Sequence, residues 1–231
     1  MQGPITTEMM HAKLEEMRRR NLARQSGQAE STGTPKPRGV CDRRQLELCG
    51  VYERYRGVSF ETIKNRGVPE EIRPQVDRVE DYAGHIEDNL HDGVGLILRG
   101  PVGTLKTSLA VAVLRSCLEA GRNAKFIPVT SLIDAFFSAR TMPAGDWAAL
   151  DAKLREVSLL VLDDLGVEWS EGWAMTKLAA IFTERYNRRR STIITTNLGT
   201  DEMRRRYPER IIDRLRATSR VITFNLPRSL R

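Results

Sequence analysis

The stretch VGLILRGPVGTLKT, residues 94–107, decides the fold of this chain. Its apolar beginning, residues 94–98, predicts a buried strand, and the apolar run over residues 108–119 predicts a buried helix. Between them lies a glycine-bearing loop that ends in Lys106 and Thr107. Strand, loop, Lys-Thr and helix follow one another in the order that a phosphate-binding loop requires. Backbone N–H groups and the start of the helix would hold phosphate oxygens there.

The loop motif assigns a role to each of its residues. Lys106 is expected to reach the β- and γ-phosphates of ATP, and Thr107 to ligate Mg²⁺. Leu105 stands where the motif has glycine; it adds bulk beside the phosphates but keeps its backbone N–H. The alternative is a degenerate loop that no longer binds nucleotide, and the motifs that follow argue against it. The expected nucleotide contacts are Gly100, Pro101, Val102, Gly103, Thr104, Leu105, Lys106, Thr107 and Ser108.

Two acidic residues follow a strongly apolar strand expected at residues 157–162. Such a strand delivers its acids to the carboxyl edge of the sheet, where ligands bind in open α/β sheets. We expect Asp163 to help hold Mg²⁺ and Asp164 to orient or deprotonate the attacking water. A further strand, residues 191–196, is followed by Asn197, which could position that water or could be a turn residue.

The remaining chain alternates strands and helices, which predicts a parallel sheet covered on both faces. The other expected strands are 124–128 and 221–224. The expected helices are 41–56, 74–91, 131–140 with Thr130 as its cap, one ending near residue 155, 173–189, 200–206 and 209–216.

The amino-terminal part differs in character from the rest of the chain. Residues 8–24 predict a helix with an apolar stripe of Met10, Leu14 and Met17, and residues 25–40 predict a flexible linker. We therefore divide the chain into an extension, residues 1–57, and a catalytic core, residues 58–231. The helix could bind a separate protein or dock on its own core, and the sequence favours neither.

Composition excludes several classes of protein. The chain has 231 residues and 40% hydrophobic residues, which suits one α/β domain with an extension. It has no apolar run long enough to cross a membrane and no apolar segment typical of a secretory signal. Three scattered cysteines favour a reducing cytoplasm over a disulfide framework.

Positive charge is concentrated toward both ends. The net charge is +7, and residues 184–220 alone hold 11 Arg against 5 acidic residues, a net of +6. Residues 1–40 carry a net of +3. This pattern indicates contact with nucleic acid or an acidic partner, although the two Arg triplets could equally be solvated helix ends.

The strings GLILRGPVGTLKTSLA, LLVLDDLG, STIITTNL and ERIIDRLR together resemble the DnaC/DnaI-type replicative-helicase loaders. This family of AAA+ ATPases also includes IstB-like transposition helpers, and the resemblance covers roughly residues 58–231. It implies an AAA+ fold with little or no carboxyl-terminal lid, Walker A at residues 100–107 and Walker B at Asp163 and Asp164. It also implies a sensor at Asn197, an arginine finger at Arg214 with Arg210 as its companion, and hydrolysis of ATP in a self-associated oligomer.

The same resemblance implies a helical insertion after the second strand that faces single-stranded DNA. Residues 131–155 occupy that place, which makes Phe136, Phe137, Arg140, Lys153 and Arg155 candidate DNA contacts, with core packing as the alternative for the two phenylalanines. The implied function is a loader that binds the replicative helicase through its extension and places it on single-stranded DNA. An IstB-like ATPase assisting a transposase and a non-hydrolysing adaptor are the alternatives.

Overall fold

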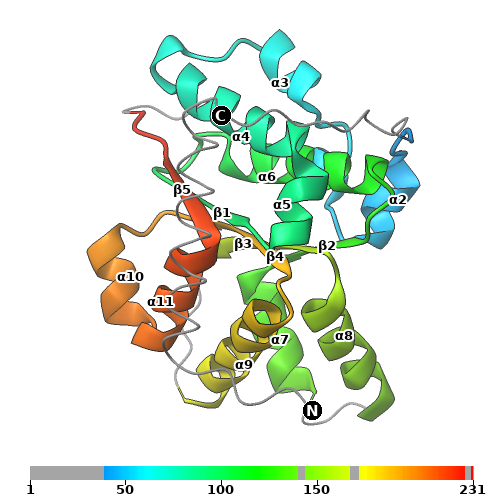
Figure 1. Ribbon diagram of the computed structural model, residues 1–231, viewed down its shortest axis with the longest axis vertical. Helices are drawn as coiled ribbons and strands as arrows, with labels where there is room; N and C mark the ends of the chain where they lie inside the picture. The colour runs from blue at the N-terminus through cyan, green and yellow to red at the C-terminus, as the bar shows by residue number, and fades with distance from the viewer. Residues whose placement is uncertain (1–38, 140–143, 167–171, 227–229, 231) are drawn as a thin grey trace. The chain divides into compact units, whose positions relative to one another are not determined.

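A parallel sheet of five strands forms the centre of the computed structural model, which describes residues 39–139, 144–166, 172–226 and 230. Its order is β2-β3-β4-β1-β5, and each neighbouring pair is parallel (Figure 1). This arrangement confirms the predicted α/β fold. The strands are β1 (Gly95–Arg99), β2 (Ala124–Pro128), β3 (Leu159–Leu165), β4 (Ser191–Thr196) and β5 (Ser219–Thr223).

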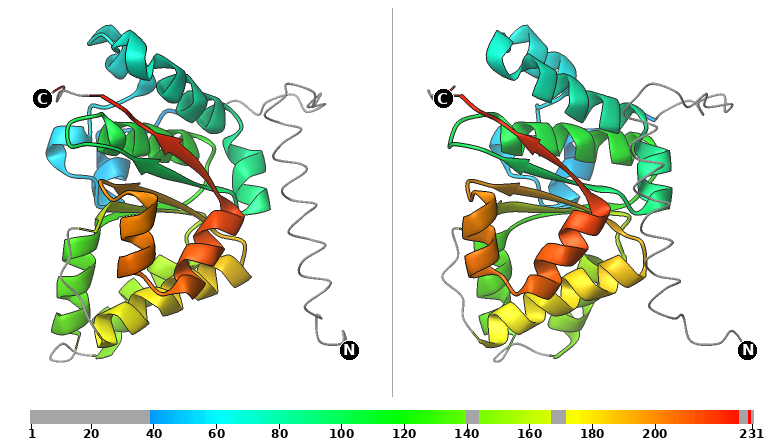
Figure 2. Two further views of the ribbon diagram at one scale, coloured as in Figure 1. Left: turned by 90° about the vertical axis from the view of Figure 1, so that its left-hand side faces the viewer. Right: turned by 60° about the vertical axis from the view of Figure 1, so that its left-hand side comes forward.

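Helices cover both faces of this sheet (Figures 1 and 2). One face carries α2 (Arg43–Leu48), α3 (Phe60–Asn65), α4 (Arg73–Gly84), α5 (Ile86–Asp92) and α6 (Lys106–Glu119), with short 3₁₀ turns at Glu53–Tyr55 and Glu70–Ile72. The other face carries α7 (Val129–Ser138), α8 (Ala144–Glu156), α9 (Trp173–Asn187), α10 (Thr200–Arg206) and α11 (Glu209–Thr218).

Side-chain alternation along the strands divides the core into two clusters, one on each face. In β1, Leu96 and Leu98 pack with α4 and α6, whereas Ile97 packs with α9 and α11. In β3, Leu159 and Val161 belong to the cluster with α4 and α6, whereas the residues that alternate with them belong to the other cluster. Strands that are buried on both faces read as continuous apolar runs, which is why the sequence predicted them well.

Several helix boundaries differ from the expectations, and three of these differences change how a helix begins or divides. The helix expected at 74–91 is two helices that meet at His85, whose backbone (φ −105, ψ 34) is not helical. The helix expected from Ser131 begins at Val129 directly after Pro128, so Thr130 is not its cap. The helix expected at 41–56 is the short helix α2 followed by a 3₁₀ turn. The helix expected at 8–24 lies outside the described residues.

Residues 41–57 belong to the core, so the boundary expected between residues 57 and 58 moves to a point before residue 39. Leu46 and Val51 are buried in the same cluster as α6. Arg115 of α6 holds the segment by donating hydrogen bonds to two of its carbonyls, those of Cys41 (2.7 Å) and Arg56 (2.8 Å), and to the carbonyl of Val58 (3.0 Å), which follows it directly. The partner-binding role expected of residues 1–57 therefore stays a prediction only for the part before this segment.

Arg185 of α9 is fully buried, and its guanidinium joins three elements. It donates to the carbonyls of Leu154 and Val157, where α8 ends, and to the carbonyl of Ser191 and the hydroxyl of Thr192 in β4. No carboxylate in the described part of the chain pairs with it, and burial lowers the pKa of Arg185 to about 9, with Arg190 adding to the shift. Five donors in a planar fork suit such a set of carbonyl acceptors.

All three cysteines are free and buried. Burial raises the pKa of the Cys117 thiol to about 12. Within the described ranges, no helix is long and apolar enough to cross a membrane.

Candidate functional site: a phosphate loop at the carboxyl edge of the sheet

The phosphate loop follows β1 at the carboxyl edge of the sheet and leads directly into α6. Leu105 immediately precedes this helix and adopts the left-handed conformation (φ 65, ψ 4). That region favours glycine because a Cβ approaches the carbonyl oxygen, which explains why the motif places glycine here. The Leu105 side chain is half-buried and packs on the core cluster beneath α6, so the larger residue is accommodated in the fold.

Lys106 lies across the inside of its own loop. Its ammonium donates to the carbonyl oxygens of Gly100 (2.8 Å) and Pro101 (2.7 Å) and lies 3.5 Å from the hydroxyl of Thr104. The side chain is buried, at 5% exposure, so its positive charge lies within the loop. An anion entering the loop would compete with these carbonyls for the ammonium, and a charged acceptor forms the stronger bond.

Thr107 and Asp163, the two residues expected to hold Mg²⁺, are in contact. The Thr107 hydroxyl donates to Asp163, at 3.0 Å from Oδ1 and 3.3 Å from Oδ2. Thr195 of β4 donates to the same carboxylate at 2.6 Å. Burial raises the pKa of Asp163, with Asp164 adding to the rise, while the bonds from Thr195 and Thr107 and the charge of Lys106 act in the opposite direction.

These residues fit a magnesium ion. Mg²⁺ prefers oxygen ligands and takes only one or two of them from the protein, with phosphates and water completing its shell. Thr107 and Asp163 supply a hydroxyl and a carboxylate in contact, and burial makes a cation beside that carboxylate favourable. The described residues contain no group of three or more His, Cys, Asp or Glu that could hold a metal ion.

Asp164 sits at an irregularity in β3. The pairing with β4 shifts between Leu162 and Leu165, and Asp164 adopts a left-handed backbone conformation (φ 56). Its N–H donates to the Thr195 hydroxyl at 2.8 Å, so one threonine orients both acidic residues. Sequence reasoning missed Thr195; the available signal was a hydroxyl at the end of a buried strand beside the acidic pair.

The expected sensor and arginine finger lie in different places. Asn197 is exposed directly after β4, at the same edge as the phosphate loop. Arg214 lies on α11 near the start of β5, and its guanidinium is 5.8 Å from the ring centre of Tyr186. Tyr186 lies near the start of β4, so Arg214 is close to the amino edge of the sheet. Arg210 is exposed on the same helix, and its carbonyl accepts a 3.2 Å bond from Arg214.

The candidate DNA contacts differ in whether their side chains are exposed. Phe136 is fully buried on the inner face of α7 and cannot stack on a base, so core packing is the correct interpretation for it. Arg155 forms a bidentate ion pair with Asp151, with Nε 2.7 Å from Oδ2 and Nη2 2.9 Å from Oδ1. Phe137 and Lys153 are exposed. Arg140 lies outside the described residues.

An aromatic surface that the sequence did not indicate surrounds Phe137. Phe137 is 51% exposed, and its ring lies 6.3 Å from the ring of Trp173, which is 40% exposed at the start of α9. The ammonium of Lys177 lies 5.5 Å from the Trp173 ring centre. We call Phe137, Trp173 and Lys177 the aromatic patch.

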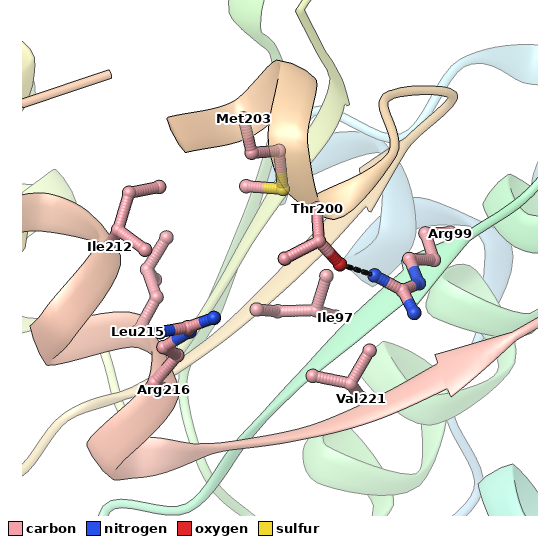
Figure 3. A pocket seen from close by; sticks show the side chains of 8 residues that line it. All are labelled: Ile97, Arg99, Thr200, Met203, Ile212, Leu215, Arg216 and Val221. Carbon is pink, nitrogen blue, oxygen red and sulfur yellow. Dashed lines mark hydrogen bonds between the residues drawn. The ribbon is translucent and has the colours of Figure 1, made fainter. Parts of the chain in front are cut away.

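A pocket of about 190 Å³ lies beneath β1 and β5, on the face of the sheet opposite α6 (Figure 3). Its walls are mostly apolar, with Arg99 and Arg216 as the charged residues. Arg99 donates to the hydroxyls of Thr200 and Thr223, which fixes the end of β1 just before the phosphate loop. The lining residues are Ile97, Arg99, Thr200, Met203, Ile212, Leu215, Arg216 and Val221.

Known proteins share this architecture. The chain is 26% identical over 186 residues to the replicative helicase loader DnaC of Escherichia coli (strain K12), which covers 79% of this chain and 73% of that protein. It is 31% identical over 167 residues to the insertion sequence ATP-binding protein y4pL of Sinorhizobium fredii (strain NBRC 101917 / NGR234), which covers 68% of this chain and 66% of that protein.

Solved structures agree. The crystal structure of the DnaC helicase loader superposes with a TM-score of 0.64 at 26% identity, over 75% of this chain and all of that chain. DnaI superposes with a TM-score of 0.63 at 18% identity, which supports the fold alone. The fold is therefore that of an AAA+ P-loop NTPase. The family model described as "IstB-like ATP binding protein" matches residues 83–227, and the chain belongs to this family.

Proposed function

We propose that this protein is an ATP-dependent loader that binds a replicative DNA helicase in the cytoplasm and helps to place it on single-stranded DNA. The observation that carries the proposal is the match to the DnaC helicase loader, whose entire solved chain is covered at 26% identity. Lys106 in the phosphate loop, together with the contacting pair Thr107 and Asp163, adds support as a site for the phosphates and the cation of Mg·ATP.

The proposed reaction is hydrolysis of ATP to ADP and phosphate. Lys106 neutralises charge on the β- and γ-phosphates, and loop N–H groups bind their oxygens. Mg²⁺, held by Thr107 and Asp163, would stabilise charge on the phosphates when bound. Asp164 orients the attacking water and accepts its proton, and Asn197 positions that water from the neighbouring strand. The Thr195 hydroxyl helps to position both acidic residues, because it donates to the Asp163 carboxylate and accepts from the Asp164 N–H.

The hydrolytic site is shared between subunits in this proposal. Arg214 lies near the amino edge of the sheet, whereas the phosphate loop follows the carboxyl end of β1. A strand of this length spans about 16 Å, so Arg214 serves the nucleotide of a neighbouring copy. An arginine supplied in trans is worth about 10³–10⁵ in rate.

Mixing two inactive variants tests this sharing. Arg214→Ala lacks the finger and Asp164→Ala lacks the water-orienting acid, so each alone should be inactive. In a mixed oligomer, an intact loop can meet an intact finger, and some ATP turnover should return. If turnover stays absent at every ratio while assembly is confirmed, the site is not shared.

Single-stranded DNA is the proposed nucleic-acid ligand. The aromatic patch offers two exposed rings on which bases can stack and a lysine for the backbone. Lys153 on α8 is a further exposed positive charge. Binding of this kind should weaken steeply as salt is raised.

The helicase is proposed to bind the residues before position 39. Three changes together, Met10, Leu14 and Met17 to Ser, remove the apolar stripe, and a matched control changes Glu16 and Arg19 to Ser with no change in net charge. The stripe variant should lose helicase association while keeping ATP binding, and the control should keep both. Loss of ATP binding in the stripe variant would show that this segment supports the core instead.

A second candidate function has its own support. Membership of the IstB-like family and the identity to y4pL favour an ATPase that assists a transposase. The same association assay separates the two proposals if helicase and transposase are both offered to the full chain. Capture of the transposase alone would reject the loader.

A further inference from the structure

Two described residues beyond β5, Phe224 and Leu230, contact the end of β1 and the phosphate loop. Phe224 is fully buried, and its N–H donates to the carbonyl of Arg99 at 2.8 Å, which extends the pairing of β5 with β1. Gly100 follows Arg99 and lies so close that a Cβ added to it would come within 2.3 Å of the Phe224 oxygen. The first residue of the loop is therefore fixed against this segment.

A second contact holds the middle of the loop. The N–H of Leu230 donates to the carbonyl of Gly103 at 3.0 Å. The Leu230 side chain packs on the core cluster beneath α6, on which Leu105 also packs. Residue 100 of the loop thus lies against Phe224, and residue 103 is held by Leu230.

This second contact has a consequence for anion binding. A trans peptide group is planar, and its C=O and N–H point in opposite directions. Holding the Gly103 oxygen toward Leu230 therefore fixes the N–H of Thr104 in the opposite direction, away from Leu230. A donor fixed in that direction before the ligand arrives spares the cost of ordering it on binding.

We propose that Leu230 is a positioning residue of the nucleotide site, whose backbone N–H holds the phosphate loop in the conformation that binds ATP. This inference rests on the proposed function, because the ligand it serves is the ATP of the phosphate loop. It adds to that function a dependence of nucleotide affinity on a residue far outside the loop motif.

A pair of substitutions isolates the N–H from the side chain. Leu230→Ala and Leu230→Pro both shorten the side chain, but only proline removes the N–H. Relative to Leu230→Ala, the Leu230→Pro protein should bind ATP about three- to tenfold more weakly, the range expected for one net hydrogen bond.

Hydrogen exchange supplies a readout that does not need nucleotide. In the nucleotide-free protein, amides of residues 100–108 should exchange faster in Leu230→Pro than in Leu230→Ala, with the strands unchanged. Equal exchange and equal ATP affinity in the two variants would overturn the inference. Faster exchange in a protein whose wild type binds no ATP would reject the proposed function and leave the role of Leu230 in ordering the loop standing.

Discussion

Leu105 offers a direct test of the loop geometry, because its backbone conformation can be separated from its side chain. Changing Leu105 to Gly removes the left-handed strain, and changing it to Ala keeps the strain; both remove the side chain beyond Cβ. Left-handed backbone costs an L-residue about 1–2 kcal/mol. Glycine lowers the free energy of unfolding by about 0.4–1 kcal/mol, because it gives the unfolded chain more conformational freedom. The glycine variant should therefore be about 1 kcal/mol more stable than the alanine variant.

The stability of the glycine variant can also be compared with that of wild type. A fully buried leucine contributes about 1.5–3 kcal/mol, and half-buried Leu105 roughly half of that. Lost packing then nearly offsets the relieved strain, and Leu105→Gly should lie within about 1 kcal/mol of wild type. Urea unfolding with equal slopes measures these differences. An alanine variant as stable as the glycine variant would refute the left-handed conformation, and weaker ATP binding in both would show that the leucine itself contributes to the site.

Three further predictions concern the rest of the molecule. Arg185→Ala leaves three buried carbonyls without their donor and should destabilise the protein by more than about 3 kcal/mol in urea unfolding, with Arg185→Lys intermediate. The pKa of Cys117 is about 12 in the folded protein, so its contribution to the free energy of unfolding is complete below pH 9 and is lost as pH rises toward 12. About 1.4 kcal/mol of this free energy should be lost between pH 8 and pH 10, and Cys117→Ala should remove this part of the pH dependence. Phe137→Ala and Trp173→Ala should each weaken single-stranded DNA binding at least fivefold, whereas Tyr52→Ala, an equally exposed aromatic outside the patch, should not.

The sequence predicted the parts of the fold that depend on local pattern. Strands buried on both faces read as apolar runs, and Lys106, Thr107, Asp163 and Asp164 follow from fixed motifs. The sequence could have decided between the two interpretations of Phe136, because Val129, Leu132, Ile133 and Phe136 lie at helical spacing and mark the inner face of α7.

Other features depend on contacts between distant residues and had no local signal. The core position of residues 41–57 depends on Arg115, which reaches carbonyls of that segment from α6. The burial of Arg185 depends on carbonyls that α8 and β4 bring together, although a lone arginine in a basic region reads as solvated. Trp173 joins Phe137 only once α7 and α9 pack side by side.

The central claim is that this phosphate loop binds Mg·ATP although leucine replaces its glycine. Calorimetric titration of ATP with magnesium into wild type and Lys106→Ala tests it most directly, with circular dichroism to confirm that the variant is folded. Charge-assisted hydrogen bonds contribute about 1.5–3 kcal/mol, so Lys106→Ala should bind roughly 10- to 100-fold more weakly than wild type. Equal affinity in the two proteins, or no binding by wild type, would contradict the claim.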